Sequence, residues 1–211
     1  PVKKRSNLKI VVKAHVQKIN FEGKKAVGVS YYLEGKLKSV KANKEVILSA
    51  GAIGSPHLLQ TSGIGDGEKL KNQNIDTIHE LKGVGKNLQD HLMFRPIYKV
   101  KNLKSLNGKI NSIVGNILIG LEYFLKQSGP MTMGASQVCG FVKSDSSRAT
   151  PNLQCHVQPL STDILGADKM HEFDGITPTI ANIRPTSRGE VNIVSKDSRI
   201  NPKIKMNYLS T

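Results

Sequence analysis

The chain has 211 residues, enough for one large domain or two small ones. It carries 31 Lys and Arg against 16 Asp and Glu, which gives a formal net charge of +15. A hydrophobic content of 38% fits a folded protein, and the lack of any run of about 20 apolar residues argues against a membrane-spanning helix.

The strong positive charge first suggests a nucleic-acid-binding protein. Apart from Lys3, Lys4 and Arg5, however, the basic residues are spread singly along the chain. The five Phe and five Tyr form no base-stacking motif. Solvated surface lysines are therefore the favoured explanation, and we expect no nucleic-acid partner. A basic nucleic-acid-binding module is kept as a minor alternative, and its binding would fall steeply with salt.

Nucleophilic and metal chemistry find little support in the sequence. Cys139 and Cys155 have neither zinc-pair nor redox C-x-x-C spacing, so two free thiols are the default and one disulfide is the alternative. No serine stands in a nucleophile elbow, and no His, Cys and carboxylate cluster has the spacing of a metal site. We predict no metal and no catalytic residue within this chain.

The first elements in chain order are antiparallel strands. Residues 7–21, 26–35 and 36–51 each predict a strand, with turns at Gly23 and Gly35. The third strand ends in VILSAG, which is more apolar than its predecessors. This composition is typical of a strand covered on both faces.

A short helix between glycines follows this strand. Ser55 has the character of an N-cap and Pro56 that of a first helical residue, and Gly63 suits the left-handed position after the helix. A helix N-terminus after a buried strand can accept an anionic or electron-rich group. An ordinary tight strand–helix crossover explains the same residues equally well.

The remaining elements suggest a second sheet. Residues 67–75 predict a short helix and residues 76–81 a short strand, followed by the polar glycine loop at 83–92. Apolar residues recur at helical spacing over residues 110–125, which favours a core-packing helix over a membrane anchor. The second sheet is predicted from four further segments, at residues 138–144, 153–160, 176–184 and 189–195.

The stretch GAIGSPHLLQTSGIG at residues 51–65 resembles the second signature of the glucose–methanol–choline (GMC) oxidoreductases. Residues 83–91 and 184–210 resemble later blocks of that family, although Ser198 stands where the family usually has proline. The amino-acid sequences of these blocks are most similar to those of the arthropod glucose-dehydrogenase-like branch. The positions that match the signature are Gly51, Ala52, Ser55, Pro56, Leu58, Leu59, Ser62, Gly63, Ile64 and Gly65.

The resemblance implies an α/β (α+β) fold and an FAD-dependent oxidoreductase that takes hydride from the CH–OH group of an alcohol or sugar. Residues 1–93 would form part of an FAD-binding, Rossmann-like domain. Residues 94–211 would form part of a substrate-binding domain with a mainly antiparallel sheet flanked by helices. A catalytically degenerate binding protein of the same fold is the alternative. The sequence leaves localisation and oligomeric state open, with secretion as one option.

The resemblance also implies which residues meet the FAD. Val16 matches the strand position whose backbone meets adenine, and the segment from Ser49 to Ala52 matches the adenosine end. Asn87, Asp90 and His91 match a loop near the flavin, although such residues often only brace loops. The predicted cofactor-binding residues are Val16, Ser49, Ala50, Gly51, Ala52, Ser55, Asn87, Asp90 and His91.

Two blocks of the family are not found in this sequence. No G-x-G-x-x-G follows an N-terminal strand, and none of the six histidines stands in the context of the family's catalytic histidine. We assign a structural role to each histidine, His15 and His57 among them. Both ends of the sequence are interpreted as cuts in a longer chain.

From these missing blocks we predict that the isolated 211 residues are inactive and bind FAD weakly or not at all. Oxidation of an alcohol by hydride transfer needs a base for the hydroxyl proton, and no histidine here matches that base. The absorbance spectrum of the purified chain checks the prediction. Flavin that co-purifies with the isolated chain would contradict it.

Overall fold

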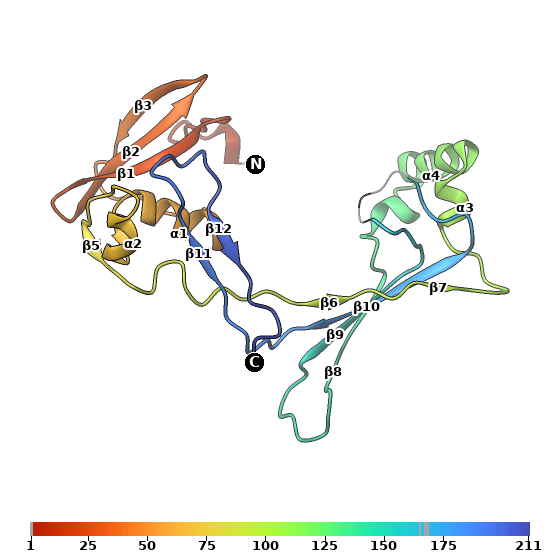
Figure 1. Cartoon of the computed structure of the whole chain (residues 1–211). Coiled ribbons are helices and arrows are strands. Elements are labelled where there is room, and N and C mark those ends of the chain that lie inside the picture. The colour runs from red at the N-terminus through yellow and green to blue at the C-terminus, as the bar shows by residue number, and fades with distance from the viewer. Residues whose placement is uncertain (1, 165, 167–168) are drawn as a thin grey trace. The chain divides into compact units, whose positions relative to one another are not determined.

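The computed structural model describes residues 2–164, 166 and 169–211 (Figure 1). The chain forms two compact units, Pro1–Gln89 with Ser187–Thr211 and Asp90–Thr186. The sequence predicts a single boundary at residues 93 and 94, close to the break after Gln89. Residues 187–211 pack with the first unit because strand β11 (Glu190–Asn192) lies against helix α1 (Gly51–Thr61).

The first unit begins with a three-stranded antiparallel sheet, as predicted. Its strands are β1 (His15–Glu22), β2 (Lys25–Leu33) and β3 (Lys36–Lys41), in the order β1-β2-β3. The chain turns back at Gly23 and again at Gly35. A short 3-10 helix, η1 (Val2–Lys4), precedes the sheet.

The predicted buried strand at residues 46–51 is wrong. Residues 45–50 pair with no strand in the part of the chain that the structure describes, and Ile47 is 79% exposed. An apolar run becomes a strand only when another strand supplies partners for its backbone groups. The segment is therefore an extended, unpaired connection from the sheet to α1.

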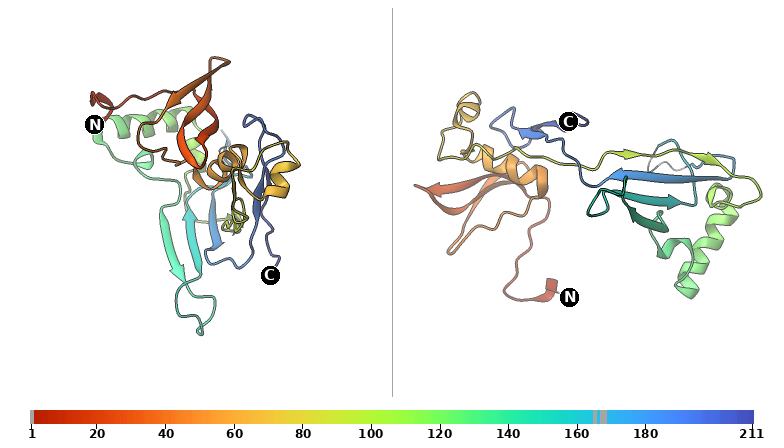
Figure 2. Two further views of the ribbon diagram at one scale, coloured as in Figure 1. Left: turned by 90° about the vertical axis from the view of Figure 1, so that its left-hand side faces the viewer. Right: turned by 90° about the horizontal axis from the view of Figure 1, so that it is seen from below.

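Helix α1 starts earlier than the sequence suggests. Ser55 is not its N-cap: the helix begins at Gly51, so Pro56 lies inside it, and the Ser55 hydroxyl accepts a hydrogen bond from the Ala50 N–H (3.1 Å). The end is as predicted, since Gly63 follows the helix with φ +86 and donates to the Gln60 carbonyl (3.0 Å). α1 packs against β1, as Figure 2 shows.

A small parallel pair and a short helix follow α1. Strand β4 (Ile64–Gly65) pairs in parallel with β5 (His79–Glu80), and α2 (Gly67–Lys71) lies between them in sequence. The Asp66 carboxylate caps α2 by accepting from the N–H groups of Glu68 and Lys69. This agrees with the predicted short helix and strand.

A buried amide joins α1 to the C-terminal segment. The Gln60 side chain is 3% exposed; its Nε2 donates to the Val191 carbonyl (3.0 Å) and its Oε1 accepts from the Ile193 N–H (3.3 Å). The Gly85 carbonyl accepts from the Val191 N–H (2.6 Å), and a Cβ at Gly85 would collide with the Val191 carbonyl oxygen. Strand β12 (Lys203–Lys205) pairs with β11 beside this junction.

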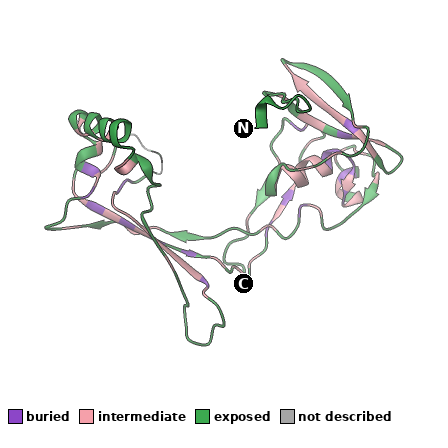
Figure 3. Ribbon diagram, turned by 180° about the vertical axis from the view of Figure 1, so that it is seen from behind, coloured by how far each residue is buried: buried purple, intermediate pink, exposed green. Residues whose placement is uncertain are grey.

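The second unit is built on an antiparallel sheet of order β6-β10-β9-β8, with β7 also paired to β10. The segment 189–195, predicted to belong to this sheet, instead forms β11 in the first unit. Alternate residues of β10 are buried, which Figure 3 shows as purple along the strand. The strands are β6 (Met93–Phe94), β7 (Tyr98–Lys99), β8 (Val138–Val142), β9 (Leu153–Gln158) and β10 (Gly175–Asn182).

The helices of this unit are α3 (Asn107–Ile110), α4 (Ile113–Lys126) and η2 (Pro130–Thr132). The predicted helix at 110–125 is confirmed as α4, but its predicted core packing is wrong. α4 contacts α3 and η2, but many of its apolar side chains are exposed, with Ile113 81% and Phe124 79% exposed. None of the described helices has the length and apolar character needed to cross a membrane.

Two further expectations concern Cys139 and Cys155. Both thiols are free, as the default prediction has it, with Cys139 exposed and Cys155 half-buried. They lie on neighbouring strands, but Cys139 faces His156 and Cys155 faces Gly140. Among the described residues no group of His, Cys, Asp and Glu is arranged to hold a metal ion.

Replacing Gln60 with leucine is expected to destabilise the first unit by about 2–4 kcal/mol, because the Val191 carbonyl and the Ile193 N–H lose their amide partner inside the protein. Urea unfolding measures the change. Gln137→Leu, at an exposed glutamine, is the matched control and should shift the midpoint little. Equal effects of the two substitutions would show that the buried amide contributes nothing.

Asn107 is expected to have the same importance in the second unit. Its side chain is fully buried, donates to the Phe173 carbonyl (2.8 Å) and accepts from the Ser161 N–H (2.9 Å). Asn107→Leu should cost about 2–4 kcal/mol, since both backbone groups are left unpaired. Asn116→Leu removes an exposed hydrogen bond from the Asn116 side-chain amide to the Ile110 carbonyl. It should cost under about 1 kcal/mol in the same unfolding measurement. Similar losses would refute the assigned role.

Candidate functional site

A cavity of about 580 Å³ lies between the first sheet, the unpaired segment and α1. We call it the α1–β1 cavity. Its lining comes from residues 14–16, Ile19 and Val29 of the sheet region, residues 46–50, Gly54, His57 and Leu58 of α1, and Ser198. It therefore brings together three of the predicted cofactor residues, Val16, Ser49 and Ala50, from two segments that are distant in sequence.

The walls of the α1–β1 cavity are mainly aliphatic. Valine, isoleucine, leucine and alanine side chains supply most of the lining, and none of the described lining residues is Lys or Arg. The polar side chains are those of Ser49, Ser198, His15 and His57. Such a cavity suits a flat, largely apolar group with a few polar atoms at its edge.

Ser198 closes one side of the cavity with a hydrogen-bond cluster. Its buried hydroxyl lies 2.9 Å from the Val16 carbonyl, 3.1 Å from Gln17 Oε1 and 3.0 Å from His15 Nε2. The sequence marks Ser198 only as a departure from the family's proline. Its role depends on contacts across more than 180 residues, which no local pattern reveals.

His57 carries the one buried side-chain nitrogen or oxygen of the lining that has no hydrogen-bond partner among the described residues. Its Nε2 is buried and has no hydrogen-bond partner among those residues. Burial lowers the pKa of the His57 imidazole, and the nearby His15 lowers it further. The sequence assigns His57 a structural role. Its spacing of three residues after Gly54, on the same helix face, was the available sign that it shares a wall with that glycine.

The start of α1 borders the cavity through Ala50 and Gly54. Ala50 is the N-cap, Gly51 opens the helix with φ +78, and a Cβ built on Gly51 would meet no atom within 4 Å. Ser55 is engaged with the Ala50 N–H and does not line the cavity. The first helical N–H groups have no helical acceptor, so this end can bind a polar group.

A second, smaller cavity of about 330 Å³ brings Ala52 and Asn87 together. It lies between α1 and residues 85–89, with Val191 also in its wall. Asn87 adopts φ +62, a conformation that asparagine tolerates better than most residues. Bracing of the loop and contact with a ligand both remain compatible with this position.

Asp90 and His91 are not brought to either cavity. Both residues belong to the second unit, and neither lines the α1–β1 cavity or its smaller neighbour. His91 is exposed. Their predicted part in cofactor binding stays a prediction.

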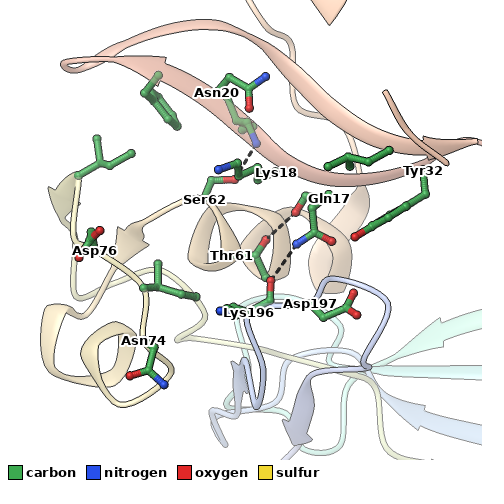
Figure 4. A pocket seen from close by; sticks show the side chains of 15 residues that line it. Gln17, Lys18, Asn20, Tyr32, Thr61, Ser62, Asn74, Asp76, Lys196 and Asp197 are labelled. Atoms are coloured by element: carbon green, nitrogen blue, oxygen red, sulfur yellow. Dashed lines mark hydrogen bonds between the residues drawn. The ribbon is translucent and has the colours of Figure 1, made fainter. Parts of the chain in front are cut away.

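Another cavity, of about 710 Å³, lies beside the α1–β1 cavity and shares Ile19 with it. Figure 4 shows polar side chains around it, among them Gln17, Thr61 and Asp197. Several of them are already paired: Gln17 Nε2 donates to the Lys196 carbonyl (2.8 Å), and the Ser62 hydroxyl accepts from the Ile19 N–H (2.8 Å). Only Ile19 of the α1–β1 lining faces it, and no predicted site residue does.

Comparison with known proteins shows what the chain is similar to. Residues 1–93 match the family model described as GMC oxidoreductase. The oxygen-dependent choline dehydrogenase of Chromohalobacter salexigens is 39% identical over 208 residues, covering 99% of this chain and 37% of that protein. The enzyme of the same name from Serratia proteamaculans is 40% identical over 210 residues, covering 98% and 37%. The chain thus spans about 37% of the length of these curated relatives.

Solved structures show the same fold at lower identity. The formate oxidase of Aspergillus oryzae matches with a TM-score of 0.88 at 24% identity, covering 100% of this chain and 41% of that one. An FAD-dependent oxidoreductase from Chaetomium thermophilum matches with a TM-score of 0.79 at 23% identity, covering 95% and 41%. Residues 1–93 of the chain are thus similar to the GMC oxidoreductase family model, and the similarity to the curated relatives extends over nearly its whole length.

Proposed function

We propose that this chain is part of an FAD-dependent oxidoreductase acting on CH–OH donors, and that its α1–β1 cavity holds the adenosine end of the FAD. One observation carries the proposal. Val16, Ser49 and Ala50, which the family resemblance assigns to adenine and adenosine, line a single aliphatic cavity. Relatives that are about 40% identical over nearly the whole chain are choline dehydrogenases by name, which supports the same reaction class.

The residues present fit the adenosine portion of FAD. Aliphatic side chains can pack on both faces of a purine, and the space beside Gly51 lets a ligand approach the start of α1. When bound, FAD supplies the redox chemistry by accepting hydride, and the protein supplies position and electrostatics.

We assign the second unit to substrate binding. Its antiparallel sheet, built on β8, β9 and β10, agrees with the sheet that the family resemblance implies for the substrate domain. The substrate is an alcohol or a sugar under this proposal. Assignment to the arthropod glucose-dehydrogenase-like branch is based only on the amino-acid sequences of the blocks that resemble the family.

The net charge favours one second candidate, a binding protein of the same fold that has lost catalysis. A charge of +15 could direct such a protein to an acidic partner or surface. The two candidates differ in a simple observation. The enzyme bleaches its flavin when an alcohol or sugar substrate is added without oxygen, and the degenerate protein does not.

The cavity assignment is tested by filling it. Gly54→Leu places a large side chain in the wall of the α1–β1 cavity, and we expect it to weaken FAD binding about five- to hundredfold through overpacking. Flavin fluorescence titration of the full-length natural protein that contains this chain measures the dissociation constant. Gly120→Leu is the control, because it also replaces a helical glycine; a Cβ at Gly120 meets no atom within 4 Å, whereas one at Gly54 meets the Ala50 Cβ at 3.0 Å.

The control should leave FAD affinity unchanged, and circular dichroism should show both variants folded. Normal FAD affinity in folded Gly54→Leu protein would place the adenosine end elsewhere. A wild-type protein that binds no FAD would refute the proposed function as a whole.

A further inference from the structure

The first residues of β1 contain a β-bulge beside the α1–β1 cavity. Val16 pairs with Tyr31 of β2, and the next paired residue is Lys18, so Gln17 has no partner in the ladder. A bulge interrupts the regular hydrogen bonds between two strands and bends the bulged strand. Val16, which lines the cavity, comes directly before the unpaired residue. The position of Val16 therefore depends on support from outside the ladder.

A turn at residues 196–199 supplies this support. The Ser198 hydroxyl oxygen lies 2.9 Å from the Val16 carbonyl oxygen and 3.1 Å from Gln17 Oε1. The Ser198 N–H donates to the same Gln17 Oε1 (3.3 Å), and Gln17 Nε2 donates to the Lys196 carbonyl (2.8 Å). The amide of the bulged residue is thus bound to the turn through both its oxygen and its nitrogen. We call these contacts of Val16, Gln17, Lys196 and Ser198 the Ser198 clamp.

Two further contacts hold the turn against the same end of the hairpin. His15 Nε2 lies 3.0 Å from the Ser198 carbonyl oxygen. The Arg199 guanidinium lies over the Tyr32 ring, 4.3 Å from its centroid, and Tyr32 is the β2 partner of His15. Ser198 itself is 6% exposed, so water competes little for its hydrogen bonds. The turn therefore contacts both strands at the point where β1 borders the cavity.

We propose that Ser198 is a positioning residue for the adenosine end of FAD, because its clamp holds the bulged end of β1 and so keeps Val16 in the cavity wall. Ser198 acts through β1 and needs no contact with the cofactor. The inference rests on the proposed function, since it needs FAD in the α1–β1 cavity. It goes further by giving a role to a residue at which this chain departs from the family's proline.

The clamp affects affinity through the fraction of molecules whose cavity wall is in place. Without the clamp the bulged end of β1 is ordered for part of the time, and the apparent dissociation constant rises in inverse proportion to the ordered fraction. A ligand that lacks the adenosine end does not depend on this wall. A general loss of stability, in contrast, would weaken the binding of every flavin compound. Loss of the clamp is therefore recognised by a change in the ratio of two affinities.

The experiment compares FAD with FMN, which shares the flavin and lacks the adenosine end. The full-length natural protein that contains this chain is freed of flavin and titrated with each compound. Ser198→Ala should weaken FAD binding about two- to tenfold and leave FMN binding unchanged. Ser198→Thr keeps the hydroxyl and should recover part of the loss. Ser6→Ala, at an exposed serine of the same unit, is the matched control and should change neither affinity.

Hydrogen exchange of the flavin-free proteins supplies the second measurement. The backbone amides of residues 15–18 should exchange faster in Ser198→Ala than in wild type, while the amides between β2 and β3 keep their exchange rates. Should Ser198→Ala fail to fold, Gln17→Leu removes the clamp from the side of the strand and replaces it in both measurements.

Three results would each overturn the inference while the proposed function survives. The folded clamp variant binds FAD as tightly as wild type does, the affinities for FAD and FMN fall together, or hydrogen exchange at residues 15–18 is unchanged. Absence of FAD binding by wild type would instead overturn the proposed function itself, and this inference with it.

Discussion

The buried Gln60 amide is the contact on which the first unit depends. From the last turn of α1 it hydrogen-bonds the backbone of Val191 in β11 and of Ile193 just after it, and so joins segments more than 130 residues apart. Gly85 must lie close to Val191 at the same junction, because no side chain fits there. These contacts hold Ser198 near β1, and without Ser198 the α1–β1 cavity would lose one of its sides.

Local signals in the sequence predicted much of the fold. The hairpins at Gly23 and Gly35 and the helix end at Gly63 each follow from the conformational preference of one or two residues. The start of α1 was misplaced because Ser-Pro is typical of a first turn, whereas here Pro56 follows several helical residues. Hydrophobicity likewise predicted a buried strand at 46–51, although burial depends on a partner strand.

The candidate site was predictable only in part, because its walls come from distant segments. The resemblance named Val16, Ser49 and Ala50, and the cavity holds all three. It could not name Ser198, whose partners are in β1, nor show that the His57 ring nitrogen would be buried without a partner. The pairing of β6 with β10 and the packing of β11 against α1 are equally non-local, since each joins segments that are far apart in the chain.

The Ser198 carbonyl fixes the position of one hydrogen on the His15 ring. Nε2 lies 3.0 Å from the Ser198 carbonyl oxygen, and a carbonyl can only accept, so Nε2 carries a hydrogen. The serine hydroxyl then points its own hydrogen toward Val16 or Gln17. A proline at this position has no hydroxyl to offer. With a proline in place of Ser198, the Val16 carbonyl would lose this hydroxyl donor and keep both lone pairs available, so Ser198 limits what else that carbonyl can accept.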